Sequence, residues 1–238
     1  MPTRKDIIKS YNLIVGGIDD KASYGEIERA YGGVVRAAKG KMLESITQHL
    51  VRIAWQELGQ DDSRLSIGKI KTYKIHVKEG YVKSLKDKEV QEYILENLDD
   101  HYYRTQVDVH VFVDNRFVLG IECKAYAENA MLKRILVDFM LLKHLHKNLV
   151  CCLIQLESQL GGDYSKPLSK VQYGSASTHT LMSFFETVDL NIITILKGER
   201  KVDRPIHKPN YFKKLDENLL DATVKKMKRL LFPFCDKQ

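Results

Sequence analysis

The sequence has no hydrophobic run approaching the roughly 18 residues that a transmembrane helix requires. Its first residues, MPTRKDIIKSYN, also lack the apolar segment of roughly 7–15 residues that marks a signal peptide. We therefore expect a cytoplasmic protein without a membrane partner.

Cysteine and proline are scarce. The four cysteines, Cys123, Cys151, Cys152 and Cys235, form no C-x-x-C pair, which excludes a zinc finger and a disulfide framework. Only five prolines and 14 glycines occur in 238 residues, and they form no low-complexity linker. With 44% hydrophobic residues the chain can bury a sizeable core, so we expect one folded domain over residues 1–238.

Basic residues outnumber acidic ones. The 38 Lys and Arg against 31 Asp and Glu give a net charge of +7 and a pI near 9.0. Such a balance favours a polyanionic partner without identifying it. Residues 198–238 carry 11 basic and 6 acidic side chains, which suits either a phosphate-contacting face or an ordinary solvated helix surface.

Hydrophobic periodicity predicts an α/β fold. Apolar residues at helical spacing predict helices over 5–15 and 23–58, and glycines 32, 33 and 40 are expected to break or bend the second. The order of elements indicates a single domain with a mixed central sheet flanked by helices. The further expected elements are strands over 65–83 with a basic face, a helix over 88–98, a hairpin around 114–116, a buried helix over 128–149, a core strand at 149–157, a helix over 178–187, a strand over 189–196 and a helix over 216–231.

The predicted hairpin brings two carboxylates together. QVDVHVFV and RFVLGIECKAY are strand-like runs on either side of a turn, so paired positions sum to about 230 and Asp108 lies opposite Glu122. Strand alternation points Glu122 and Lys124 to one face and Cys123 to the other. Facing carboxylates repel each other unless a cation lies between them. Mg²⁺ satisfies this arrangement with carboxylate oxygens, the carbonyl of Cys123 and waters.

Other readings of these acids are open. Acid-x-Lys also occurs at residues 19–21 and 199–201, but only Glu122 and Lys124 lie among apolar strand residues. The alternative interpretation of Glu122 and Lys124 is a purely structural ion-pair ladder on a half-buried strand. Asp114 is a rival metal ligand, although its position favours a turn.

The motif and its setting resemble a known family. The hairpin QVDVHVFVDNRFVLGIECKAY, the long helix after it and the strand LVCCLIQLE are similar to the PD-(D/E)XK nucleases, and among them to the type II restriction endonucleases. The match covers roughly residues 104–157, with Asp108 as the first acid, Glu122-Cys123-Lys124 as acid-x-Lys, and 13 residues between. It departs from the pattern at Val107, where the family name implies proline.

The resemblance implies roles for these residues. Asp108 and Glu122 would hold one or two Mg²⁺ ions that polarise the scissile phosphate and lower the pKa of the attacking water. Lys124 would orient that water and stabilise negative charge in the transition state. Many members add a glutamate from an N-terminal helix, and Glu44 in GKMLESITQHL offers one, with a helix-surface acid or an ion pair to Lys41 as its alternative.

The resemblance also implies a DNA substrate. We expect a catalytic core at about 40–160 and DNA-recognition elements at about 65–83 and 158–214, although polar connecting loops are the alternative for the latter. Candidate DNA contacts are Lys69, Lys71, Lys74, Gln159, Tyr164, Lys166, Lys170, Gln172 and Tyr173.

The leading hypothesis is a Mg²⁺-dependent, sequence-specific double-stranded DNA endonuclease of the restriction type. Symmetric cutting of two strands favours a homodimer. One alternative is a structure-specific repair or recombination nuclease of the same superfamily. The other is a non-catalytic basic DNA-binding module.

Overall fold

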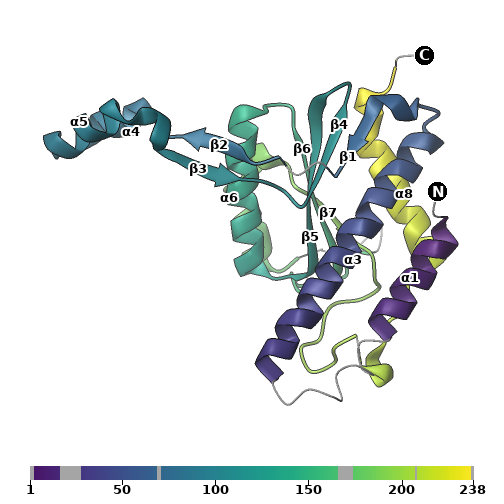
Figure 1. Cartoon of the computed structure of the whole chain (residues 1–238). Helices are drawn as coiled ribbons and strands as arrows, with labels where there is room; N and C mark the ends of the chain where they lie inside the picture. The colour runs from purple at the N-terminus through teal and green to yellow at the C-terminus, as the bar shows by residue number, and fades with distance from the viewer. Residues whose placement is uncertain (1–2, 17–27, 69–70, 166–173, 207, 237–238) are drawn as a thin grey trace.

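A computed structural model describes residues 3–16, 28–68, 71–165, 174–206 and 208–236. The chain forms one body with a long projection to one side (Figure 1). No helix in these ranges is long and apolar enough to cross a membrane. The helices are α1 (Arg4–Gly16), α3 (Glu28–Glu57), α4 (Glu79–Ser84), α5 (Lys88–Glu96), α6 (Asn129–Leu145), α7 (Ala176–Ser183) and α8 (Glu217–Leu231); the strands are β1 (Leu65–Ile67), β2 (Tyr73–His76), β3 (Tyr102–Thr105), β4 (Val109–Val113), β5 (Arg116–Ala127), β6 (Val150–Ser158) and β7 (Asn191–Thr194).

A five-stranded mixed sheet forms the centre of the body. Its order is β1-β4-β5-β6-β7. The pairs β1–β4 and β4–β5 are antiparallel, whereas the pairs β5–β6 and β6–β7 are parallel. The predicted hairpin is present, and its turn residues Asp114 and Asn115 have φ of 50° and 61°. Two consecutive positive φ values are typical of the tight turns whose twist matches that of the strands. The predicted α/β fold with a mixed sheet is confirmed.

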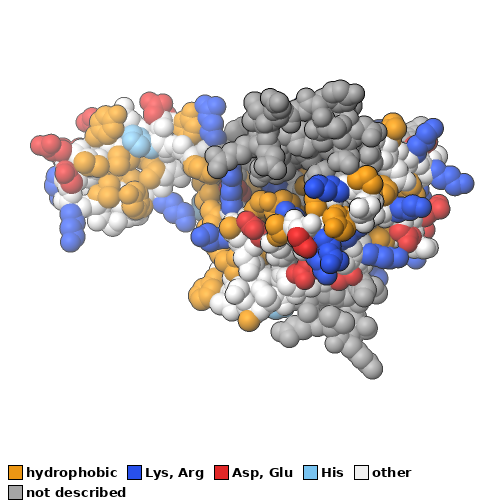
Figure 2. Space-filling model, turned by 90° about the horizontal axis from the view of Figure 1, so that it is seen from below, with side chains coloured by type: hydrophobic (Ala, Val, Ile, Leu, Met, Phe, Trp, Pro, Cys, Tyr) orange, Lys and Arg blue, Asp and Glu red, His pale blue; other side chains and the backbone are white. Residues whose placement is uncertain are grey.

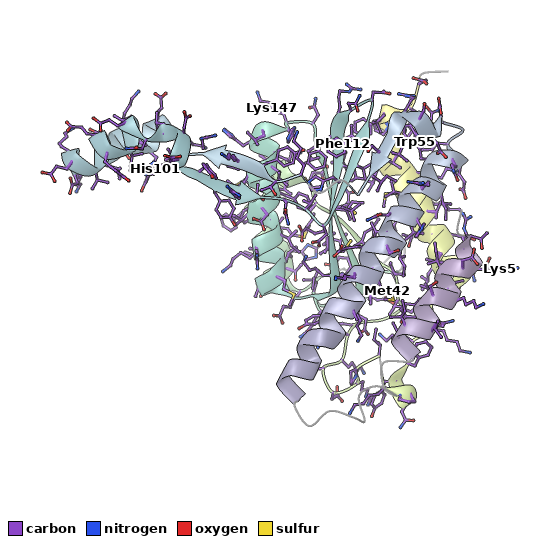
Figure 3. The ribbon with its side chains drawn as sticks, viewed as in Figure 1. Lys5, Met42, Trp55, His101, Phe112 and Lys147 are labelled. Carbon is purple, nitrogen blue, oxygen red and sulfur yellow. The ribbon has the colours of Figure 1, made fainter. Side chains whose placement is uncertain are left out.

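Helices cover both faces of this sheet. On one face α1, α3 and α8 pack against apolar side chains of every sheet strand, and the buried residues there include Trp55, Leu119 and Ile154. On the other face α6 and α7 enclose a second cluster around Phe139 and Leu153. Figure 3 shows Met42 where α3 crosses in front of the sheet, and Phe112 near the upper end of the sheet in this view. Because β5 is covered on both faces, a charged side chain on it is costly unless it is paired.

The expected break in the second helix is wrong. Helix α3 continues for 30 residues from Glu28 to Glu57 and passes through all three glycines. A glycine in a helix costs only about 1 kcal/mol relative to alanine, and burial of the side that faces the sheet outweighs that cost.

Two other boundaries, and the burial of one helix, differ from the predictions. Residues 79–83, expected as strand, belong to helix α4. Helix α7 covers Ala176–Ser183 instead of 178–187, because the side chain of Ser175 caps it by accepting from the backbone N–H of Thr178. Helix α6 buries one face, while Val137 and Met140 on its outer side are 37% and 43% exposed.

A separate arm projects from the body, as Figure 1 shows at the left. We define the arm as residues 73–105: β2 and β3 form an antiparallel ribbon, and α4 and α5 lie at its outer end. Its base is fixed by aromatic packing, since Tyr73 stacks on Phe117 with ring centroids 5.5 Å apart and meets His146 edge-on at 4.8 Å.

Candidate active site

The β4–β5 hairpin places the predicted acids side by side. Val109 pairs with Ile121, so the register carries Asp108, one residue before β4, to the position beside Glu122. Lys124 follows on the same face of β5, and its Nζ donates to Glu122 Oε2 at 2.5 Å and to Asp108 Oδ2 at 2.8 Å. The three predicted residues therefore meet at one point.

Two further contacts fix this cluster. The backbone N–H of Cys123 donates to Asp108 Oδ2 at 2.7 Å, which orients the first carboxylate toward β5. The thiol of Cys123 points to the opposite layer, where it lies 3.5 Å from the hydroxyl of Thr47 on α3. The strand alternation expected from the sequence is therefore present around the site.

Burial makes the cluster electrostatically unusual. Burial raises the pKa of Glu122 to about 7; Lys124 opposes this rise and Asp108 adds to it. Burial lowers the pKa of Lys124, but the two neighbouring carboxylates outweigh that effect and hold the pKa above its ordinary value. Lys124 therefore stays charged, whereas Glu122 changes protonation near neutral pH without another cation.

Glu44 faces the same site from α3. Burial raises its pKa, and Asp108 adds to the rise while Lys124 and Lys41 oppose it. Glu44 is thus close enough to feel both site charges, whereas no ion pair joins it to Lys41 among the described residues. A role for Glu44 as a third carboxylate of the site stays a prediction.

The donor set suits a hard divalent cation. In the described part of the chain no group of three or more His, Cys, Asp or Glu is gathered tightly enough to form a complete metal cage. The cluster instead offers two adjacent carboxylates, already bridged by the positive charge of Lys124. Oxygen donors completed by waters are what Mg²⁺ prefers, so the residues fit this ion.

Two further polar residues, neither of them among the predicted site residues, lie near the site. Asp138 is the one acid in α6, and it lies close enough to Glu122 to help raise the pKa of that carboxyl. Gln155 pairs in register with Lys124, is fully buried, and donates to Thr194 Oγ1 at 3.0 Å. The only acid in a helix with a largely apolar sequence was the available sign for Asp138.

The rival acids, and also the buried Glu157, have structural partners elsewhere. Asp114 lies in the hairpin turn and pairs with Arg64 at 2.7 Å, as its turn position predicted. Glu199 accepts from the backbone N–H groups of Gly161 and Gly162. Glu157, at the end of β6, pairs with Lys213 at 2.6 Å. None of these acids joins the Asp108 cluster, whereas the other rival motif at 19–21 lies outside the described residues.

The predicted DNA contacts fall in different settings. Lys71 and Lys74 are exposed at and beyond the base of the arm. The amide oxygen of Gln159 accepts from Arg200, and Tyr164 is partly buried against the second core cluster. The remaining candidates lie outside the described residues: Lys69, Lys166, Lys170, Gln172 and Tyr173.

Comparison with known proteins provides the family. The chain is 52% identical over 223 residues to the type II restriction enzyme DdeI of Desulfomicrobium norvegicum, a match that spans 92% of each protein. No family model matches the sequence. Among solved structures it is similar to the native BbvCI A2B2 tetramer, with a TM-score of 0.39 and 11% identity over 98% of this chain and 89% of that one. By its identity to DdeI over nearly its whole length, the chain belongs to the type II restriction endonucleases of the PD-(D/E)XK superfamily, which cut DNA at specific sequences.

Proposed function

We propose that the Asp108 cluster is the catalytic centre of this endonuclease and that Mg²⁺ is its metal. The observation that carries the proposal is the pair of adjacent carboxylates on a covered sheet, bridged by Lys124 Nζ at 2.5 and 2.8 Å. Asp108, Glu122 and the carbonyl of Cys123 would hold the ion. When bound, Mg²⁺ supplies Lewis-acid polarisation of the scissile phosphate.

The chain's own residues do the remaining work. Lys124, kept charged by its two neighbours, is placed to donate to the attacking water and to the negative charge that develops on the phosphate. The N–H of Cys123 holds Asp108 in the orientation that leaves its second oxygen for the ion. Glu44 approaches from α3 as a further acceptor for ion-bound or free water. The mechanism needs no covalent protein intermediate.

Cleavage of plasmid DNA tests the reaction and its site together. Purified protein is incubated with a mixed-sequence plasmid in Mg²⁺, with Ca²⁺ as control, and every DNA end is sequenced. We expect ends at one short motif in Mg²⁺. Asp108→Asn and Lys124→Ala should each lower the cleavage rate at least about 100-fold. Lys133→Ala, at an exposed lysine of α6, is the matched control and should cut normally.

Three outcomes would contradict parts of this proposal. Cleavage within a fewfold of wild type in both site variants would move the catalytic centre elsewhere. Scattered ends would favour the structure-specific nuclease over the restriction enzyme. Salt-sensitive DNA binding without cleavage in Mg²⁺ would leave the non-catalytic module.

We further propose that the ribbon of the arm contacts the DNA backbone. Lys74 and Arg104 face each other across β2 and β3, and both lie over the ring of Tyr102, at 4.1 and 5.3 Å from its centroid. Like charges at paired positions repel. Within the described residues no carboxylate pairs with either cation, so a phosphate is the partner that best relieves their repulsion. Strand β3 ends at Thr105, three residues before Asp108, which keeps this contact next to the cleavage site.

Salt dependence of binding tests the ribbon. In Ca²⁺, Lys74→Ala and Arg104→Ala should each weaken DNA binding at all sequences and reduce the slope of log affinity against log salt by roughly 1. Lys133→Ala should leave the slope unchanged. A wild-type slope in both ribbon variants would remove the ribbon from the interface.

We also propose the division of the chain into a catalytic core and recognition elements, and its assembly as a homodimer, as expected from the sequence. The catalytic core covers about 40–160, and the recognition elements cover about 65–83 and 158–214, which include Lys71, Gln159 and Tyr164. Two subunits, each with one metal site, would cut the two DNA strands as a homodimer.

A further inference from the structure

The outer end of the arm carries an apolar surface that no described residue of the chain covers. We define the tip as residues 79–100, which hold α4 and α5. Tyr81, Val90 and Tyr93 are 59%, 45% and 61% exposed, and Leu95 is 38% exposed. Figure 2 shows hydrophobic side chains gathered on one face of this end of the arm.

Helix α5 shows the same imbalance in its own pattern. Val90, Tyr93 and Ile94 share one side of the helix, yet α5 contains no buried residue. An amphipathic helix of this kind normally buries its apolar stripe against another element. In the described chain the tip packs mainly on itself, through α4 and α5, and Tyr93 meets the ring of His101 at the edge of the ribbon with ring centroids 5.7 Å apart. The narrow ribbon holds the tip away from the body (Figure 1). Exposed apolar surface of this kind marks a site of interaction with another molecule.

Charge identifies the partner. The tip has seven acidic and three basic side chains, a net charge of −4, so the other 216 residues carry +11. An acidic surface is repelled by the phosphate backbone of DNA, which excludes the substrate as the cover. The strongly basic body of another copy of this chain is attractive to the tip, and two tips would repel each other.

We propose that the tip of each arm docks on the basic body of a second copy of the chain. The inference rests on the homodimer of the proposed function and names the surface that builds it. Two copies related by a twofold axis exchange identical tip-on-body contacts, so the assembly closes at two. In this interface the apolar side chains of the tip would be buried at the centre, and the acidic side chains around them would fix the orientation of the tip on the basic body.

The length of the arm is consistent with docking of its tip on a second copy of the chain. The four-residue strands extend roughly 13 Å and the nine-residue helix α5 adds roughly another 13 Å at the usual rise per residue. The ribbon thus carries DNA-contacting cations near the body, while the tip lies beyond them. One arm would touch the DNA along its length and the partner subunit at its end.

Sedimentation equilibrium without DNA tests the docking. The double variant Tyr81→Ser/Tyr93→Ser should raise the dimer dissociation constant about tenfold or more. Tyr103→Ser is the matched control, because Tyr103 is 55% exposed on the same arm but belongs to the ribbon. A second variant, Glu92→Lys/Glu96→Lys, alters charge and keeps the apolar face. It should weaken the dimer at low salt and lose this effect at high salt.

The outcomes separate this inference from the homodimer itself. If wild type and the tip variants are equally tight dimers, the tip is not the interface but the homodimer stands. A dimer that tightens as salt is raised would indicate tip-to-tip pairing and overturn tip-on-body docking. A wild type that stays monomeric, free and on DNA, would refute the homodimer and the docking together, while the Asp108 and Lys124 cleavage tests still decide the catalytic centre.

Discussion

Replacing Glu122 by glutamine should remove a pH-dependent loss of stability. The carboxyl is 8% exposed, and burial raises its pKa from 4.5 to about 7. Because the pKa is higher in the folded state, the folded protein holds the proton more tightly. The resulting stabilisation is complete below pH 4.5 and is lost as the pH rises through 7. A change in pKa of this size corresponds to about 3 kcal/mol in the free energy of unfolding.

Urea unfolding in EDTA, repeated between pH 4 and 8, measures this effect. The free energy of unfolding of wild type relative to Glu122→Gln should fall by about 3 kcal/mol across the range. Lys124 stays charged throughout, so it adds no slope. Mg²⁺ should restore the stability of wild type at pH 8 and have a much smaller effect on the variant. Parallel curves for the two proteins would refute the elevated pKa and the burial argument behind it.

Three further predictions concern packing and electrostatics. Gly40→Ala should raise the free energy of unfolding by about 0.5–1 kcal/mol in chemical denaturation, because Gly40 lies within α3 and an added Cβ meets no atom within 4 Å; a loss of stability would contradict the continuous helix. Gly120→Ala should lower it by about 1–3 kcal/mol, since the Cβ would lie 3.1 Å from the ring of Phe139; an unchanged value would mean that the ring moves freely. Asp138→Asn should move the midpoint of the Glu122 pH curve downward, because Asp138 helps raise that pKa, and an unmoved midpoint would place Asp138 outside the site.

The local part of the site was predictable from the sequence, because strand pairing has strict rules. Alternation along β5 places Glu122 and Lys124 on one face. The two-residue turn at 114–115 alone would pair Asp108 with Ile121, and the register shift between Val111 and Phe112 adds the one residue that brings Asp108 beside Glu122. Counting from a break at 114–116 gives the same pairing, so these positions were predicted although the irregularity was not. Asp138 could not be found this way. Its proximity depends on how α6 packs across the sheet, and a helix can be rotated or shifted without changing its own pattern.

The arm shows the corresponding limit for the fold. Residues 73–76 and 102–105 pair across 25 intervening residues, and their alternation alone suits either the main sheet or a separate ribbon. The helix over 88–98 was predicted from its pattern, but the exposure of its apolar side to solvent was not. Periodicity predicts that an apolar face is buried, but it does not identify the element that packs on it. The uninterrupted α3 was missed for the opposite reason, since tertiary burial overrides local glycine preferences.

The position of the arm in the chain also makes it an exchangeable module. Strands β1 and β4 are neighbours in the central sheet, and the N–H of Gly68 donates to the carbonyl of His110 at 3.1 Å, so the two ends of the inserted segment are held together by the body. An insertion between fixed, adjacent ends adds closure entropy only logarithmically with its length. The arm could be shortened, lengthened or replaced while the hairpin that carries the Asp108 cluster folds as before. Evolution and protein engineers can therefore vary reach and partner contacts here independently of the chemistry.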